Sequence, residues 1–379
     1  MVYLDNSATT VVTDEVAELI CSVLTRKYGN PSAQYFLGAE AYNLISKARS
    51  QVAGVFACSP AKIFFTSGGT ESNNLAILGC AAAHPRKKHI VTTAIEHESV
   101  LNACAYLENR GYKITYIKPD KKTKCIKVSD VVDAVDSRTL LVSCMSVNNE
   151  TGDLLPLKEI VEECKKKNPE LFVHSDCVQG YGKVPLLEHE LKLDLVSGSA
   201  HKIHGPKGVG FLYIGKKGNI SPFCYGGKQE GGIHPGTENT SSIAGFGLAA
   251  EQAVYNMKEN LIKIAELRKY LIEELENLPI SIHINSPQNS LPYILNFSIP
   301  EFDSVSMIKY LSSRNIYVSS SSACNLGQKS HVLIAKGYPE AIINSSLRVS
   351  MNRFTRRNDI DNFLQGLKDM KKDVSTSKN

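Results

Sequence analysis

Short runs of β-branched and aromatic residues alternate with helix-like segments along the first two-thirds of this 379-residue chain. The runs resemble buried strands, and most are followed by small or polar residues. They cover 63–66, 89–95, 140–147, 171–174, 193–197 and 208–214. Plausible helices, such as 157–167, lie between them. This alternation predicts an α/β fold in which a mainly parallel sheet is covered by helices on both faces.

A long amphipathic segment follows this region. Leucine and isoleucine recur at three- and four-residue steps from Leu261 to Leu278, which predicts a helix with one apolar face that ends at Pro279. Shorter strands are expected after it, at 280–284, 295–299 and 316–319. We therefore expect a smaller α+β domain at the C-terminus, with a polar, frayed tail over 368–379.

Composition excludes several classes of function. The 43 basic and 38 acidic side chains leave a net charge of +5, which is too small to indicate nucleic acid or an acidic membrane as a partner. No apolar run approaches the ~18 residues that cross a bilayer, and the N-terminus lacks a secretory pattern. The closest of the ten cysteines are thirteen residues apart, so no CxxC-type metal site is predicted. We expect a cytoplasmic protein without a disulfide framework.

Polar residues follow the ends of successive predicted strands. Ligands of open parallel sheets bind beyond the carboxyl ends of the strands, so these residues would meet in one crevice. They are Thr70, His97, Asn149, Asp176 and Lys202. An acid, an amine, an imidazole and two neutral polar groups would then face the same ligand.

Two of these positions suggest specific chemistry, each with a simpler alternative. The segment 67–74 places small residues between a strand and a helix, which suits an anion, although an ordinary capped turn has the same pattern. Small residues and glycines flank Lys202. A partly desolvated amine there condenses readily with a carbonyl, whereas a surface lysine would do nothing of the kind.

The acid, the imidazole and one thiol add to this pattern. Asp176 directly follows an apolar strand, where a carboxylate needs a cation such as a pyridinium nitrogen, unless it caps the next helix. His97 is either an acid–base group that stacks on a ring or a satisfied core histidine. Cys324 stands in the small, polar stretch 319–327, unlike most other cysteines. An exposed thiol that ionises is a nucleophile.

Ten segments, in order from residue 3 to about 350, resemble the cysteine desulfurases, which are pyridoxal-phosphate enzymes of class V and fold type I. They are YLDNSATT at 3–10, GNPS at 29–32, TSGGTESNN at 66–74, EH at 96–97, VNNETG at 147–152, HSDCVQ at 174–179, HK at 201–202, GTEN at 236–239, SSAC at 321–324 and LRVS at 347–350. The resemblance implies a large domain over 14–257 with a mainly parallel seven-stranded sheet. It also implies a small α+β domain made of 1–13 and 258–379.

The resemblance implies roles for the cofactor-binding residues. Lys202 would bind pyridoxal 5′-phosphate covalently and later move the substrate's α-proton. Asp176 would pair with the pyridine nitrogen, catalytic His97 would stack on the ring, and Gln179 would hydrogen-bond the phenolic oxygen. The phosphate would be held by Gly69, Thr70, Ser199, His201 and, from the other subunit of a homodimer, Thr237.

The resemblance also implies how L-cysteine is bound and used. Asn149 would contact both cofactor and substrate, while Arg348 and Asn30 would bind the substrate carboxylate. Cys324 would take the sulfur as a persulfide, leaving L-alanine. It would pass the sulfur to an iron–sulfur scaffold protein or a tRNA-thiolation enzyme. No resident metal is implied; Cys324 would touch an iron–sulfur cluster only during transfer.

The chain departs from the family pattern at two places, and three alternative functions stay open. His234-Pro235 stands where an arginine is expected before Gly236-Thr237, and Ser321 and Asn325-Leu326 alter the cysteine segment. The alternatives are a selenocysteine lyase, another class V aminotransferase in which Cys324 is incidental, and a non-catalytic sulfur-relay scaffold with a degenerate site.

Overall fold

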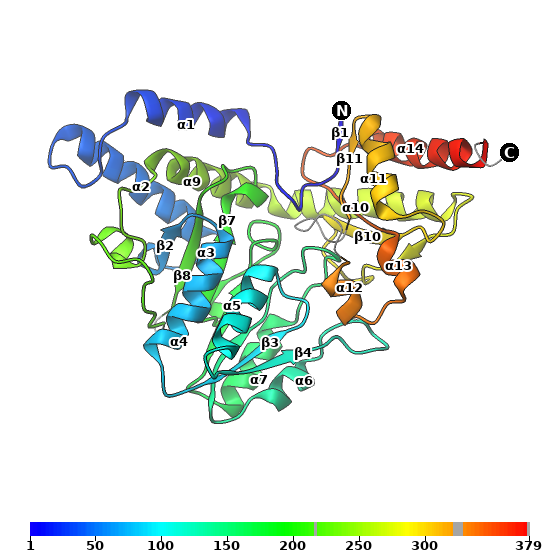
Figure 1. Ribbon diagram of the computed structural model, residues 1–379. Coiled ribbons are helices and arrows are strands. Elements are labelled where there is room, and N and C mark those ends of the chain that lie inside the picture. The colour runs from blue at the N-terminus through cyan, green and yellow to red at the C-terminus, as the bar shows by residue number, and fades with distance from the viewer. Residues whose placement is uncertain (216–217, 321–328, 377–379) are drawn as a thin grey trace.

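The computed structural model describes residues 1–215, 218–320 and 329–376. A seven-stranded sheet with the order β2-β8-β7-β6-β5-β3-β4 forms its centre (Figure 1). The strands are β2 (Ile63–Thr66), β3 (His89–Thr93), β4 (Lys113–Ile117), β5 (Thr139–Ser143), β6 (Phe172–Asp176), β7 (Leu195–Ser199) and β8 (Gly210–Ile214). Strands β3 to β7 pair in parallel, and β8 runs antiparallel to both of its neighbours. The predicted α/β class and the mainly parallel sheet are confirmed.

Helices cover both faces of this sheet. Successive strand residues alternate between two apolar clusters, because side chains on a strand point to opposite faces. In β8, Phe211 and Tyr213 belong to the first cluster, on one face of the sheet, and Leu212 and Ile214 belong to the cluster on the opposite face. The first face carries α2 (Phe36–Gly54), α6 (Val128–Ala134), α7 (Leu157–Lys167) and α9 (Thr240–Tyr255). The second carries α3 (Gly69–Asn74), α4 (Cys80–Ala83) and α5 (Glu98–Glu108).

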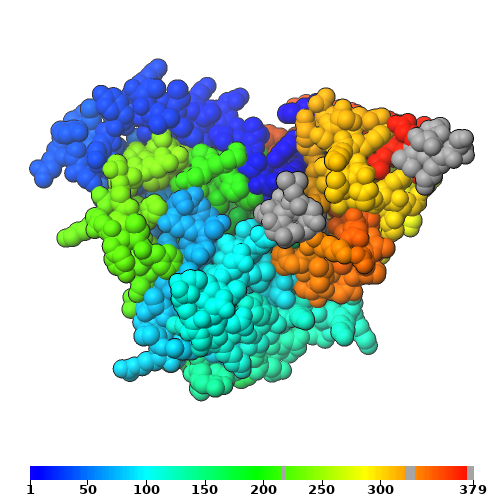
Figure 2. All heavy atoms as spheres, viewed as in Figure 1, coloured from blue at the N-terminus to red at the C-terminus, as the bar shows by residue number. Residues whose placement is uncertain are grey.

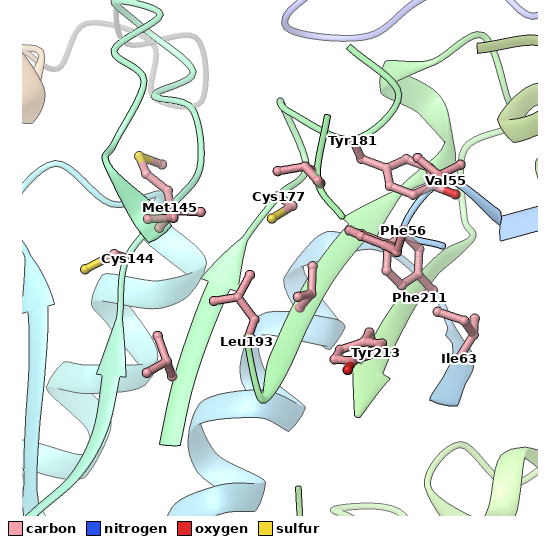
Figure 3. Close-up of a cluster of buried hydrophobic side chains, with 14 of the residues drawn as sticks. Val55, Phe56, Ile63, Cys144, Met145, Cys177, Tyr181, Leu193, Phe211 and Tyr213 are labelled. Carbon is pink, nitrogen blue, oxygen red and sulfur yellow. The ribbon is translucent and has the colours of Figure 1, made fainter. Parts of the chain in front are cut away.

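Aromatic rings fill the first cluster beneath β7 and β8 (Figure 3). The ring of Phe56 lies 5.3 Å from that of Tyr181 and 5.5 Å, edge-on, from that of Phe211. The buried Tyr181 hydroxyl donates to the carbonyl of Val52 at 3.1 Å, so its polar end is paired. This packing holds rigidly the strands whose ends carry the polar residues.

The chain outside this sheet builds a third apolar cluster of its own. Here β12 (Ser346–Ser350), β10 (Ile294–Ser298) and β9 (His283–Ile284) form an antiparallel sheet. The N-terminal β1 (Val2–Tyr3) pairs in parallel with β11 (Ile316–Tyr317). The helices in this part of the chain are α10 (Met257–Glu276), α11 (Ser304–Ser313), α12 (His331–Ala335), α13 (Glu340–Asn344) and α14 (Arg357–Thr376). They lie beside the large sheet in Figure 1.

Helix α10 confirms the predicted amphipathic helix. Ile264, Leu271 and Leu275 of its apolar face are buried in the third cluster. The prediction of a frayed tail over 368–379 is wrong for residues 368–376, because they belong to α14. Met370 is buried against the same cluster, one or two turns after Phe363 and Leu367. This apolar stripe is masked in the sequence by the polar residues around it.

Strand β4 was also missed. It is an edge strand of the sheet, and its lysine, threonine and tyrosine are exposed or half-buried, so it lacks a continuous apolar run. No helix within the described ranges is both long and apolar enough to span a membrane.

Candidate active site

A cleft of about 880 Å³ opens at the carboxyl ends of the central strands. It is lined by Gly69, Thr70, His97, Asn149, Asp176, Gln179, Ser199, His201, Lys202 and Arg348, all singled out from the sequence. Most come from the loops that follow β2, β3, β5, β6 and β7, as the strand-end rule predicts. Ser7 and Ala8, near the N-terminus, and Arg348, on β12, close the other side. The cleft therefore lies between the large sheet and the third cluster.

Lys202 ends a short 3₁₀ turn, Ala200–Lys202, directly after β7. Its amine donates to the carbonyl of Ser7 and, at 2.7 Å, to that of Ala8. The N-terminal segment is held against this turn by Thr10, whose backbone N–H and hydroxyl each donate to the His201 carbonyl at 2.9 Å. The half-buried amine thus lines the cleft, held by two backbone carbonyls of the N-terminal segment.

Asp176 ends β6 and is 5% exposed. One carboxylate oxygen accepts the backbone N–H of Val178 at 2.9 Å, and the other accepts the Asn73 amide at 2.7 Å. Neither donor is a cation. The carboxylate is therefore buried in the cleft wall with hydrogen bonds and without a countercharge among them, a setting that favours a cationic ligand.

His97 precedes α5 and caps it with its own side chain. Nδ1 accepts the backbone N–H of Ser99 at 3.2 Å and lies 2.8 Å from the Ser99 hydroxyl. The imidazole is half-buried and lines the cleft. The cap fixes the direction of the ring, because two contacts hold the same nitrogen.

Gln179 lies one turn beyond Asp176 and is buried. Its amide nitrogen donates to the Ser7 carbonyl at 3.0 Å, and its oxygen accepts the amine of Lys183 at 3.3 Å. Burial, and then the charges of Lys202 and Arg348, lowers the pKa of Lys183 to about 7. A second amine that is neutral for much of the time at physiological pH thus stands behind the cleft.

The loop after β2 and the turn after β7 meet at one end of the cleft. A Cβ on Gly69 would lie 2.6 Å from a methyl of Val178 and 3.9 Å from the Ser199 Cβ, so only glycine keeps this space open. Burial, and then the charge of Lys202, lowers the pKa of His201 to about 3, so its imidazole is neutral and offers hydrogen bonds. Backbone N–H groups, hydroxyls and an imidazole suit an anion such as a phosphate.

Arg348 is 1% exposed at the opposite end of the cleft. One terminal nitrogen donates to the Asn149 carbonyl at 2.9 Å and the other to a carboxylate oxygen of Asp5 at 2.8 Å. Its Nε is buried without a hydrogen-bond partner among the described residues. Because the guanidinium also lines the cleft, it is suited to a carboxylate ligand.

Three predicted residues are not placed in this cleft. Asn30 and Thr237 are exposed and are not among its lining residues. The Asn30 side chain accepts the backbone N–H of Ser32 at 2.9 Å. Cys324 lies outside the described residues. The substrate role of Asn30, the cross-subunit role of Thr237 and the thiol role of Cys324 therefore stay predictions.

The sequence reading missed residues that act through others. Asn73 and Ser99 connect Asp176 to His97, and Lys183 binds Gln179. Each lies two to four residues from a predicted site residue. That closeness along the chain was the available signal, and for Asn73 it is a shared helix face, because Asn73 follows Gly69 and Thr70 by four and three residues in α3.

The residues present fit pyridoxal 5′-phosphate. An amine suits its aldehyde, a buried carboxylate suits its ring nitrogen, a capped imidazole suits its ring face, and the loop around Gly69 suits its phosphate. The observation that decides the fit is the space at Gly69, which any side chain would fill.

Comparison with known proteins agrees with this chemistry. The family model for aminotransferase class-V matches residues 2–363. The cysteine desulfurase IscS of Methanosarcina thermophila is 40% identical over 368 residues, which cover 96% of this chain and 90% of the relative. A solved NifS-like protein superimposes with a TM-score of 0.92 at 39% identity, covering 97% of this chain and 98% of the other. SspA, solved in complex with cysteine, has a TM-score of 0.81 at 32% identity, covering 94% and 100%. The chain therefore belongs to the class-V aminotransferase family and, within it, to the pyridoxal-phosphate-dependent cysteine desulfurases.

Proposed function

We propose that this protein converts L-cysteine to L-alanine and keeps the sulfur on Cys324 as a persulfide, for delivery to an acceptor protein. The observation that carries the proposal is the convergence of Lys202, Asp176, His97 and Arg348 in one cleft. An amine, a carboxylate, an imidazole and a guanidinium are the groups that an amino-acid enzyme of this class needs. The related SspA binds cysteine, which supports cysteine as the substrate here.

The side chains divide the work between the two ends of the cleft. Arg348 binds the substrate carboxylate through its planar fork, and Asn149 lies beside it. Lys202 removes the α-proton, since its amine lines the cleft on the same side as Asp176 and the loop around Gly69. Asp176 keeps a positive ring nitrogen in place. Bound pyridoxal 5′-phosphate supplies an electron sink for the pair released at the α-carbon.

The sulfur step balances without an external oxidant. The Cys324 thiolate forms an S–S bond with the sulfur of the bound cysteine. The bond between that sulfur and Cβ breaks, and its electron pair stays on Cβ, which takes up a proton and becomes the methyl group of alanine. The sulfur is oxidised and the carbon is reduced by the same two electrons. Lys329 and His331, which follow Cys324 closely in the sequence, line the cleft.

The direct experiment measures alanine and persulfide together. Wild type and C324S are incubated with pyridoxal phosphate and L-cysteine, alanine is quantified, and protein-bound persulfide is read by mass spectrometry. We expect one persulfide, on Cys324, and loss of most alanine formation in C324S. Alanine formation at the wild-type rate in C324S would contradict the role of the thiol. C21S, which removes an exposed thiol, is the matched control.

We propose a cytoplasmic protein that serves iron–sulfur assembly or tRNA thiolation. Every cysteine in the described part of the chain is free, which suits a reducing compartment. Charging the protein with radiolabelled cysteine and offering it a cell extract identifies the acceptor. Label recovered on a scaffold protein or on a tRNA-modifying enzyme decides between the two.

We also propose two domains, 14–257 and 1–13 with 258–379, which share one cleft. The separate apolar clusters around the large sheet and around α10 support this division. Limited proteolysis with substrate present and absent tests it, since cuts should fall near the proposed boundaries and change on binding.

We also propose that the protein is a homodimer. The helices α1 (Asp14–Arg26) and α2, blue in Figure 2, form one edge of the molecule. Tyr28, Tyr35, Phe36 and Tyr42 expose 60 to 81% of their surface there, an apolar area that a second copy would cover. The segment with Thr237 is held by the Glu71–His234 pair at 2.8 Å. Sedimentation should give twice the chain mass, and F36E should lower it.

A further inference from the structure

Four side chains form one hydrogen-bonded row inside the cleft, in the order Asp176, Asn73, Ser99 and His97. The Asn73 amide nitrogen lies 2.7 Å from a carboxylate oxygen of Asp176 and 2.9 Å from the Ser99 hydroxyl. The Ser99 hydroxyl lies 2.8 Å from Nδ1 of His97. Asn73 and Ser99 are buried, so water competes little for these bonds.

Each bond in this row has a fixed direction. An ionised Asp176 only accepts, so the Asn73 atom that faces it is the amide nitrogen. The second amide hydrogen of Asn73 then goes to the Ser99 oxygen, which leaves the Ser99 hydroxyl hydrogen for Nδ1 of His97. The Ser99 backbone N–H donates to the same nitrogen at 3.2 Å. Nδ1 therefore accepts twice, and the neutral ring carries its proton on Nε2.

A purely structural reading explains Asn73 less well. Its side-chain oxygen is buried without a hydrogen-bond partner among the described residues. An unpaired buried acceptor destabilises the fold, and an apolar residue of similar shape would avoid that loss. The asparagine is better explained by the two bonds that its nitrogen donates, one to Asp176 and one to Ser99.

We infer that Asn73 and Ser99 are positioning residues that link the charge on Asp176 to His97 and hold His97 in its Nε2–H form. The inference rests on the proposed function, and it adds that His97 exchanges a proton during the reaction. His97 then enters the reaction as a proton donor from Nε2. It accepts a proton at Nε2 only after giving the first one away.

The test reads the proton on His97 directly. Full-length protein with ¹⁵N-labelled histidine is studied by two-bond ¹H–¹⁵N correlation spectra, with and without pyridoxal phosphate, and H97Q assigns the signal. We expect the Nε2–H form in wild type. N73A removes both bonds that the Asn73 nitrogen donates, and S99A removes the hydroxyl that binds His97. Each variant therefore loses at least one ordinary hydrogen bond of the row, and the ratio of the two forms should change at least about fivefold. S99T keeps the hydroxyl and should restore the wild-type ratio.

Two controls and one kinetic readout complete the experiment. N109A changes an exposed asparagine that follows α5, and S50A changes an exposed serine; both should match wild type. In N73A and S99A, kcat for alanine formation should fall about tenfold with little change in KM, and S99T should recover it. If N73A does not fold, the S99A and S99T pair decides.

The outcomes separate this inference from the proposed function. A wild-type His97 protonated at Nδ1, or a ratio that is unchanged in both alanine variants, overturns the positioning role. A wild type that forms no alanine overturns the proposed function, while the spectra still decide on the role of Asn73 and Ser99.

Discussion

The buried amine of Lys183 makes the stability of this protein depend on pH in a calculable way. Burial, and then the nearby charges of Lys202 and Arg348, lowers its pKa from 10.5 to about 7. Between these values the unfolded chain holds the proton and the folded chain releases it. The free energy of unfolding therefore rises with pH across this window, and the contribution is lost as the pH falls through 7.

The magnitude follows from the two pKa values. From pH 7 to pH 9, the Lys183 contribution should rise by about 2 kcal/mol. Methionine has a similar length and does not titrate, so K183M should lack this rise. It should also be more stable than wild type at pH 6, where the wild type buries a charged amine.

The assay is urea unfolding of both proteins between pH 6 and pH 9, followed by circular dichroism. K258M, which changes an exposed lysine of α10, is the matched control and should stay parallel to wild type. A difference between wild type and K183M that is constant across this pH range would refute the reasoning, because Lys183 would then titrate alike in the folded and unfolded chains.

Three further predictions concern the cleft. G69A should weaken retention of pyridoxal phosphate about tenfold, because the added methyl overpacks against Val178, and V178A in the same chain should restore retention. Visible absorbance after dialysis measures the cofactor that stays bound, and full retention in G69A would contradict the prediction. R348K keeps the charge and loses the fork, so KM for L-cysteine should rise at least about tenfold in steady-state assays, and an unchanged KM would remove Arg348 from the substrate site. Burial raises the pKa of Glu150 to about 7, so between pH 5 and pH 7 the folded chain holds a proton that the unfolded chain has lost. From pH 5 to pH 7.5, the free energy of unfolding of wild type should therefore fall by about 2 kcal/mol relative to that of E150Q. If the unfolding free energies of the two proteins in urea change in parallel with pH, Glu150 does not titrate in this way.

The sheet and the strand-end residues were predictable for one physical reason. Strands buried on both faces are nearly continuous apolar runs, and the polar residue that ends such a run, such as Asp176 after β6, lies at the edge where ligands bind. Strand β4 escaped because it is an edge strand without such a run. The tail helix escaped because Phe363, Leu367 and Met370 form an apolar stripe within polar composition.

The links between site residues were not predictable, since they join parts of the chain that only folding brings together. Asn73 meets Asp176 across 103 residues, and Arg348 meets Asp5 across 343. Nothing local in the sequence separates Lys183, which is buried, from the many exposed lysines. The resemblance to known enzymes indicates the roles of single residues, and the folded structure shows the contacts that orient them.

The central claim is that the amine of Lys202 forms the covalent bond to pyridoxal 5′-phosphate. Reducing the loaded protein with borohydride and mapping the modified peptide by mass spectrometry tests it most directly. We predict one modified lysine, at position 202, and none in K202A. A modification at Lys183, the other buried amine beside the cleft, or no modification at all, would contradict the account.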